Sequence, residues 1–168
     1  LSNATVSAFG GVLFQSPTTA IASGIWVKDG TLSITGNAST LAYGVYIGGG
    51  TSASNVLTLN ATNATINVTG LTPSTNVNFT NTGPGVAIVG PGVLISAGDS
   101  SGANGTINIV GNASYGAGVN LTSATLAASG NGTITVNGTS VEGTGLLMTS
   151  LSTGNQSYST GNKTMNLS

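Results

Sequence analysis

One short pattern recurs four times along the chain: threonine, aliphatic, small polar, aliphatic, one further residue, glycine. The copies are TLSITG at Thr31, TINVTG at Thr65, TINIVG at Thr106 and TITVNG at Thr133. Strict alternation of apolar and polar residues is typical of a half-buried strand, because successive side chains point to opposite faces. A single copy has too few inward aliphatic side chains to form a core, so the copies must stack on one another. The inward side chains are Leu32, Ile34, Ile66, Val68, Ile107, Ile109, Ile134 and Val136.

A second pattern consists of glycine, aliphatic, any residue, aliphatic. It occurs as GIWV at Gly24, GVYI at Gly44, GVAI at Gly85, GVNL at Gly118 and GLLM at Gly145. We interpret each copy as a corner, where positive φ or a missing Cβ is useful, followed by two inward residues. The expected inward residues are Ile25, Val27, Val45, Ile47, Val86, Ile88, Val119, Leu121, Leu146 and Met148. The middle residues, which point outward, are Trp26, Tyr46, Ala87, Asn120 and Leu147. This interpretation predicts that Trp26 and Tyr46 lie near each other on adjacent coils.

The two patterns combine into a longer unit that appears three times, as TLSITGNASTLAYGVYI, TINIVGNASYGAGVNL and TITVNGTSVEGTGLLM. Stacked units of this kind predict one all-β domain over residues 1–168, a parallel β-helix (β-solenoid) of roughly six to eight coils with inserted loops. An inserted loop or an extra turn of coil is expected at Leu71–Gly85. An antiparallel β-sandwich or jelly roll also uses many short alternating strands and remains the alternative. The sequence starts without methionine and stops inside a repeat, so we expect it to be a segment of a longer repeat protein.

Charge excludes several classes of partner. Charged residues make up only 3% of the chain, and Lys28 and Lys163 are its only cations. We therefore expect no nucleic-acid partner, because there is no basic surface to hold a phosphate backbone. We also expect no membrane insertion, since the longest apolar tract, Gly85–Gly98, is short and is interrupted by Pro91.

Few residues offer catalytic chemistry. The carboxylates are Asp29, Asp99 and Glu142, which lie in different repeats, and the chain has no histidine or cysteine. Acid–base, nucleophilic and metal sites need such groups close together, so we expect no enzyme, no cofactor and no metal site. A glycan-cleaving β-helix enzyme that uses Asp99 or Glu142 is the remaining enzymatic alternative.

Asparagine glycosylation signals are dense. The acceptor pattern Asn-x-Ser/Thr occurs 14 times, whereas 18 asparagines and 47 serines and threonines would give roughly five by chance. Strand alternation alone explains part of the excess, because it places Asn and Thr two residues apart on the same face; surface N-glycosylation is the second explanation. The candidate sites are Asn3, Asn37, Asn60, Asn63, Asn67, Asn78, Asn104, Asn112, Asn120, Asn131, Asn137, Asn155, Asn162 and Asn166.

The phrases NGTSVEGTGLLM and GNASYGAGVNLTSATLAASGNGTITV carry a family resemblance. They resemble the repeat region of filamentous-haemagglutinin-like exoproteins, the bacterial surface adhesins exported by two-partner secretion. The resemblance covers Thr31–Ser168 and Leu1–Gly11. It implies a right-handed parallel β-helix in a long surface fibre, with roles in attachment, aggregation or contact-dependent toxin delivery. It also suits the glycosylation signals, because some adhesins of this family are glycosylated at such sites.

Together these observations predict a non-catalytic structural and adhesive segment of a secreted or cell-surface fibre. Expected partners are carbohydrate or protein receptors, or further copies of the chain. Trp26 and Tyr46 are either a structural aromatic ladder or surface contacts for such a partner. The alternative is a self-assembling glycosylated subunit of an extracellular filament or surface layer.

Overall fold

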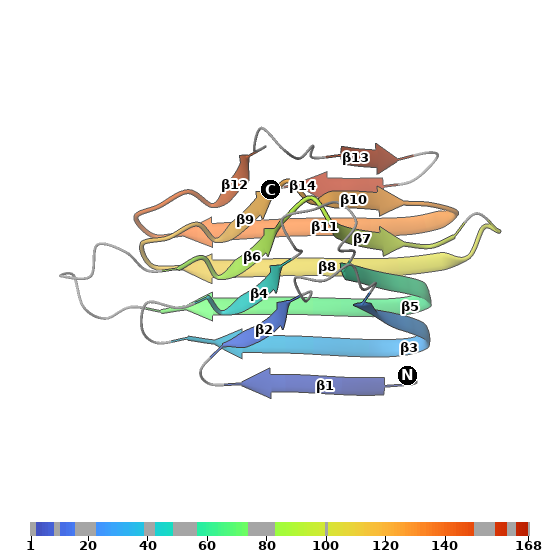
Figure 1. Ribbon diagram of the computed structural model, residues 1–168, viewed down its shortest axis with the longest axis horizontal. Coiled ribbons are helices and arrows are strands. Elements are labelled where there is room, and N and C mark those ends of the chain that lie inside the picture. Colours follow the sequence, from blue (N-terminus) through green and yellow to red (C-terminus); the bar gives the residue numbers. More distant parts are fainter. Residues whose placement is uncertain are drawn as a thin grey trace.

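The computed structural model is built from β-strands joined by turns and loops, and its described part contains no helix (Figure 1). It describes residues 3–8, 11–15, 23–38, 43–48, 57–73, 83–99, 101–149, 157–160 and 164–167. The strands are β1 (Asn3–Ala8), β2 (Val12–Gln15), β3 (Ser23–Asn37), β4 (Val45–Gly48), β5 (Leu57–Thr72), β6 (Val86–Val89), β7 (Val93–Ala97), β8 (Asn104–Ala113), β9 (Val119–Thr122), β10 (Thr125–Ala128), β11 (Asn131–Ser140), β12 (Leu146–Thr149), β13 (Ser157–Thr160) and β14 (Thr164–Leu167). The all-β prediction is confirmed.

All strand pairs in the described ranges are parallel. Nine strands form one sheet, with the order β13-β10-β7-β5-β8-β11-β14; β3 pairs with β5, and β1 pairs with β3. Five short strands form the other sheet, with the order β12-β9-β6-β4-β2. An antiparallel sandwich or jelly roll requires antiparallel neighbours, so that alternative is wrong.

The nine-stranded sheet curls because its long strands turn in the middle. Leu57–Ala61 of β5 pairs with β7, whereas Ala64–Thr72 pairs with β8. At the turn Asn63 has a φ of 49°, and Asp29 at the matching position of β3 has a φ of 53°. Asn and Asp adopt this left-handed conformation more readily than most other residues with a side chain.

Three parallel ladders result from this turn. We call Ser23–Lys28, Leu57–Ala61, β7, β10 and β13 the first ladder. The second ladder contains β1, the remainders of β3 and β5, and then β8, β11 and β14. The five-stranded sheet is the third ladder. From β3 to β12 the chain passes through the first, second and third ladders in turn, again and again.

The second ladder aligns the repeated pattern as the sequence predicts. Thr65 is in register with Thr106, which in turn is in register with Thr133. The inward aliphatic residues form two continuous rows that are at most 2% exposed: Leu32, Ile66, Ile107 and Ile134; and Ile34, Val68, Ile109 and Val136. They join the inward side chains of the other ladders in a single core.

Glycine is required where the second ladder meets the third. A Cβ on Gly70 would overlap the carbonyl oxygen of Gly85, and a Cβ on Gly111 would overlap that of Gly118. Gly36 and Gly138 face Gly44 and Gly145 in the same way. None of these eight described glycines has a positive φ. Glycine is therefore required at each of these corners because the backbones of the second and third ladders approach too closely to leave room for a Cβ.

One of the five tetrapeptides does not lie where the sequence predicts. Val45, Val86, Val119 and Leu146 are in register in the third ladder. GIWV instead lies in the first ladder, where Trp26 is in register with Asn60. The prediction that Trp26 and Tyr46 are neighbours is wrong, because Trp26 lies in the first ladder and Tyr46 pairs with Leu13 and Ala87 in the third ladder.

Burial departs from the prediction at four further positions, one of which is Ile25 in the first ladder, predicted inside but only partly buried. Met148 is 37% exposed and Leu146 is only partly buried, because β12 pairs with a described strand on one side only. Ala87 was expected outside but is buried. Its small methyl group lies between Tyr46 and Asn120 in the register, and their longer side chains flank it.

Candidate functional site

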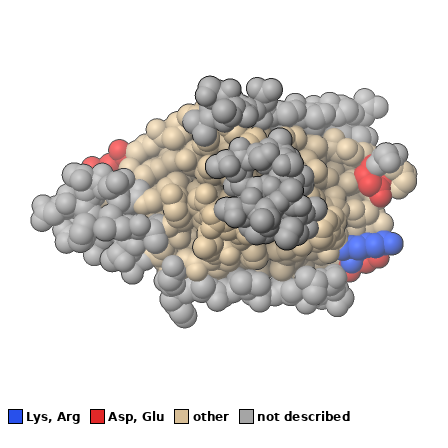
Figure 2. Space-filling view, viewed as in Figure 1, with Lys and Arg blue, Asp and Glu red and all other residues tan. Residues whose placement is uncertain are grey.

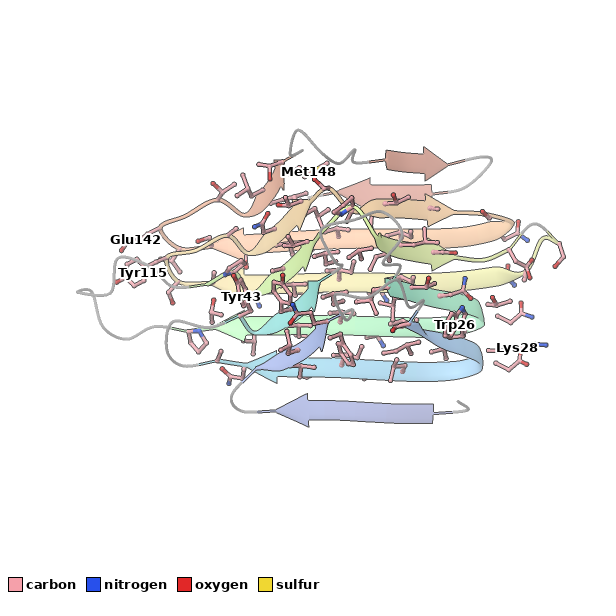
Figure 3. All side chains as sticks on the ribbon, in the orientation of Figure 1. Trp26, Lys28, Tyr43, Tyr115, Glu142 and Met148 are labelled. Atoms are coloured by element: carbon pink, nitrogen blue, oxygen red, sulfur yellow. The ribbon has the colours of Figure 1, made fainter. Side chains whose placement is uncertain are left out.

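A hollow of about 390 Å³ lies where the first ladder turns into the second. We call it the corner hollow. Figure 3 places Trp26 and Lys28 at this end of the long strands. In Figure 2 basic atoms lie beside acidic atoms at the same end, and further acidic atoms lie at the opposite end. The residues that line the corner hollow are Trp26, Val27, Lys28, Asn60, Thr62, Asn63, Asp99, Ser101 and Ala103.

Trp26 provides an aromatic surface at the hollow. Its side chain is 58% exposed, although it follows the partly buried Ile25 and precedes the buried Val27. Part of the indole ring lies over the backbone of Gly24, where an added Cβ would be 2.8 Å from the Cη2 atom of Trp26. Gly24 therefore makes room for the ring, and much of the indole remains open to solvent.

Hydrogen-bonded amides and hydroxyls form a polar row beside Trp26. Asn60 Nδ2 donates to Ser96 Oγ at 2.9 Å, and Thr62 Oγ1 donates to Asn60 Oδ1 at 3.0 Å. At the turn, Asn63 Oδ1 accepts a hydrogen bond from the backbone nitrogen of Asn104 at 3.1 Å. The bonds of Asn60 to Ser96 and of Asn104 to Asn63 join β5 to its neighbours, and the bond of Thr62 to Asn60 lies within β5, so that together they fix the orientation of the row.

Asp99 is the carboxylate of the hollow. Its Oδ1 atom accepts hydrogen bonds from the hydroxyl of Ser101 at 2.5 Å, the Ser101 nitrogen at 2.9 Å and the Ala103 nitrogen at 3.1 Å. The Ser101 hydroxyl lowers the pKa of Asp99 most, followed by the Ala103 amide, and the charge of Lys28 adds to the effect. Asp99 is therefore ionised at neutral pH, with Lys28 close enough to interact.

Tyr46 lies elsewhere, in the third ladder. Its ring packs against Tyr43 with centroids 4.8 Å apart. Burial raises the pKa of Tyr46, and Tyr43 adds to this effect. The ring also lies over Gly48, where an added Cβ would be 2.8 Å from the Tyr46 hydroxyl. The structure therefore does not bring the two predicted contact residues together.

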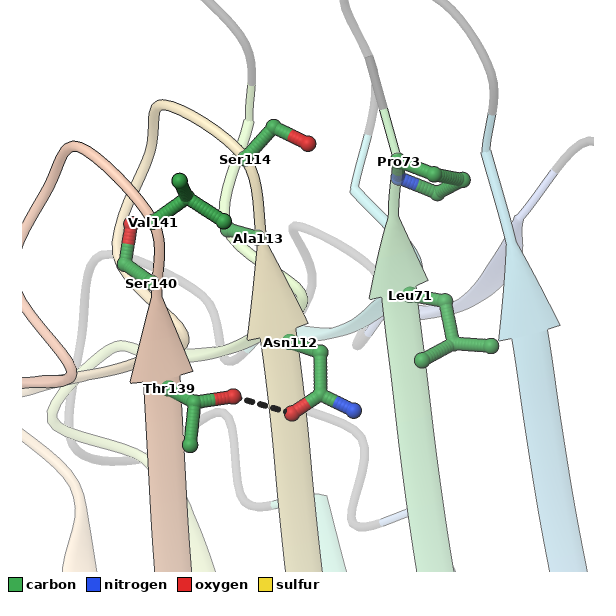
Figure 4. A pocket seen from close by; sticks show the side chains of 8 residues that line it. All are labelled: Leu71, Pro73, Asn112, Ala113, Ser114, Thr139, Ser140 and Val141. Carbon is green, nitrogen blue, oxygen red and sulfur yellow. Dashed lines mark hydrogen bonds between the residues drawn. The ribbon is translucent and has the colours of Figure 1, made fainter. Parts of the chain in front are cut away.

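A second hollow of about 330 Å³ lies at the opposite end of the second ladder (Figure 4). Its walls are mainly apolar, and Thr139 Oγ1 donates a hydrogen bond to Asn112 Oδ1 within it. None of its lining residues is ionisable; they are Leu71, Pro73, Asn112, Ala113, Ser114, Thr139, Ser140 and Val141. This hollow therefore presents a mainly apolar, uncharged surface with a few hydroxyl groups to a ligand.

The carboxylates do not converge on one site. Asp99 lines the corner hollow, Asp29 lies at the nearby turn of β3, and Glu142 lies at the other end of the long strands (Figure 3). Within the described ranges, no three His, Cys, Asp or Glu side chains come together as a metal site. The corner hollow has one carboxylate, whereas glycoside hydrolysis commonly uses a pair.

The glycosylation candidates divide by position. Asn63, Asn104, Asn112, Asn131 and Asn137 are exposed, and Asn37, Asn60, Asn67 and Asn120 are half-buried. Asn67 Oδ1 accepts a hydrogen bond from Asn108 Nδ2 at 2.9 Å, and Asn120 Oδ1 accepts one from Thr122 Oγ1 at 3.0 Å. Asn3 and Asn166 lie in β1 and β14, whose side chains are not described. Asn78, Asn155 and Asn162 lie outside the described residues.

Comparison with known proteins finds no relative of this chain. No family model matches the chain, and no curated protein or solved structure matches it. In the ranges that the structure covers, no helix has the length and apolarity needed to span a bilayer.

Proposed function

We propose that this chain is a right-handed parallel β-helix (β-solenoid) that forms a rigid, non-catalytic segment of a secreted or cell-surface adhesive fibre. The proposal is carried by one observation: the repeated Thr-aliphatic-polar-aliphatic pattern lies in register across the parallel strands β3, β5, β8 and β11. A stack of this kind extends along a single axis, with each coil contacting only its neighbours. Adding further coils to this stack makes the fibre longer and keeps it stiff, and this role requires no catalytic groups.

The outer surface supports an adhesive role. Away from the two ends of the long strands, the described residues on the face shown in Figure 2 present no charged atoms. Small polar side chains such as Ser33, Asn67, Asn108 and Thr135 share one register row on the outer side of the second ladder. Recognition of a receptor is therefore expected at the ends of the strands, where the two hollows lie.

Electron microscopy of the intact protein that contains this chain tests the proposal. Rods whose length grows by about 4.8 Å for each added coil are expected, because this is the distance between neighbouring strands. Attachment to receptor-bearing cells should accompany them. Compact globules would contradict the fibre.

Exposed apolar side chains support a second candidate, the self-assembling glycosylated subunit of an extracellular filament or surface layer. Leu13 is 65% exposed in β2, and Leu147 and Met148 are 38% and 37% exposed in β12. These are the end strands of the third ladder. Reversible, concentration-dependent filaments that Leu13→Ser weakens would favour this candidate over the adhesin; a monodisperse chain would exclude it.

Glycan occupancy should follow the exposure and hydrogen bonding of each asparagine. We expect Asn63, Asn104, Asn112 and Asn137 to carry most of the glycan on the described part of the native protein, because they are exposed. Asn60 and Asn131 should be largely unmodified, since their Nδ2 atoms, where glycan attaches, donate to Ser96 Oγ and to the Gly102 carbonyl. Glycopeptide mass spectrometry measures both groups. Equal occupancy in the two groups, or an unmodified protein, would contradict this expectation.

A further inference from the structure

We propose that the corner hollow binds a neutral sugar ring stacked on Trp26. This inference rests on the proposed adhesive function and gives its ligand a chemical class. It is carried by an open aromatic surface, a fixed row of amides and hydroxyls, and one pair of opposite charges, all around the same hollow.

The aromatic surface suits the apolar face of a sugar. Trp26 is 58% exposed at the rim of the hollow, and its ring is held over Gly24. Burial of such a ring against C–H groups gains apolar contact area, and its position restricts the conformational freedom that binding would remove. The sugar would lie on the open indole surface.

The polar groups suit ring hydroxyls. The hydrogen bonds that described residues donate to the carboxylate of Asp99 all go to Oδ1. Oδ2 is therefore available to accept from a hydroxyl, and the Lys28 ammonium can donate to a neighbouring oxygen. Asn60 stands in register with Trp26 and adds an amide held by Ser96 and Thr62.

The charges select a neutral ligand. Among the described residues that line the hollow, Lys28 and Asp99 carry the charged side chains, and their formal charges cancel. The negative charge of a phosphate or a uronic acid would be repelled by the carboxylate of Asp99. The positive charge of a cationic ligand would be repelled by the ammonium group of Lys28. The volume of about 390 Å³ is at the small end for ligand sites, which fits a short stretch of glycan.

Two sources of sugar are available. A receptor glycan would bind from solution, whereas a glycan on Asn63 would belong to the same chain, because this candidate glycosylation site also lines the hollow. The two sources share the same recognition chemistry and are separated by making the protein with and without glycan.

Fluorescence provides a direct measurement, because Trp26 is the only tryptophan in the chain. The intact chain, made in a host without N-glycosylation, is titrated with neutral oligosaccharides while tryptophan emission is followed. Saturable shifts are expected. Trp26→Ala, measured on an oligosaccharide array because it removes the fluorophore, should weaken binding about tenfold. Trp26→Phe should restore most of the binding, and the matched control Tyr43→Ala should leave it within about twofold.

The outcomes separate cleanly. Binding by the unglycosylated chain that Trp26→Ala removes supports a receptor glycan. No such binding, together with an emission shift when the glycan of the native glycoform is removed enzymatically, supports the chain's own glycan. Neither signal, or binding that Trp26→Ala leaves unchanged, overturns the proposal. If the intact protein forms rods that attach to cells but Trp26 emission and Trp26→Ala show no sugar binding, only the sugar site is refuted. If the intact protein forms compact globules, the fibre is refuted.

Discussion

Gly111→Ala is expected to lower the free energy of unfolding by about 3 kcal/mol or more. Its Cβ would overlap the carbonyl oxygen of Gly118 and lie 2.7 Å from Cγ2 of Val119. The overlap is with backbone, which cannot rotate away as a flexible side chain can. Relief therefore requires the second and third ladders to separate at this corner. Urea unfolding followed by circular dichroism measures the loss.

Gly102→Ala is the matched control. Gly102 has a φ of 91° and no heavy atom within 4 Å of an added Cβ, so it isolates backbone strain from steric overlap. It should cost about 1 kcal/mol. An equal loss in both variants would show that the corner glycines are not required for close approach.

Ile107→Ala is expected to cost about 2–5 kcal/mol. Ile107 is fully buried and lies in register between Ile66 and Ile134, so truncation leaves a cavity in the middle of a continuous row. The cost is a large part of the stability of an ordinary domain. The midpoint of urea unfolding should fall accordingly.

Val110→Ala is the control for this second prediction. Val110 lies three residues further along the same strand, on the opposite face, and is only half-buried. Its truncation should cost less than about 1 kcal/mol. Similar losses for both variants would contradict the assignment of the Ile107 face to the core.

The second ladder could be predicted from the sequence because its pattern marks both face and register. Alternation with a period of two decides which side chains are inside, and the recurring threonine and glycine give the alignment. Thr65, Thr106 and Thr133 are in register for this reason. Counting back five residues from Thr31 and Thr65 also pairs Trp26 with Asn60.

The first ladder could not be predicted in the same way. Its strands LTLNA, VLISA and TLAA have little in common except alternation, and an insertion disturbs the count. Ala61 pairs with Ala97, yet Thr106 follows Ala97 by nine positions, whereas Thr65 follows Ala61 by four. The inserted turn carries Asp99 to the corner hollow, beside Lys28. That these two residues, so far apart in the sequence, line the same hollow depends on loop geometry that no repeat encodes.

Cysteine cross-linking tests the in-register parallel stack most directly, and the chain has no cysteine of its own to interfere. Thr106→Cys combined with Thr133→Cys places two thiols at paired positions on neighbouring strands, within the range that a disulfide spans. Mild oxidation should join this pair rapidly. Thr106→Cys combined with Asn137→Cys, four residues out of register, should remain reduced. Rapid joining of the offset pair, with the register pair left reduced, would contradict the stacking on which the fibre depends.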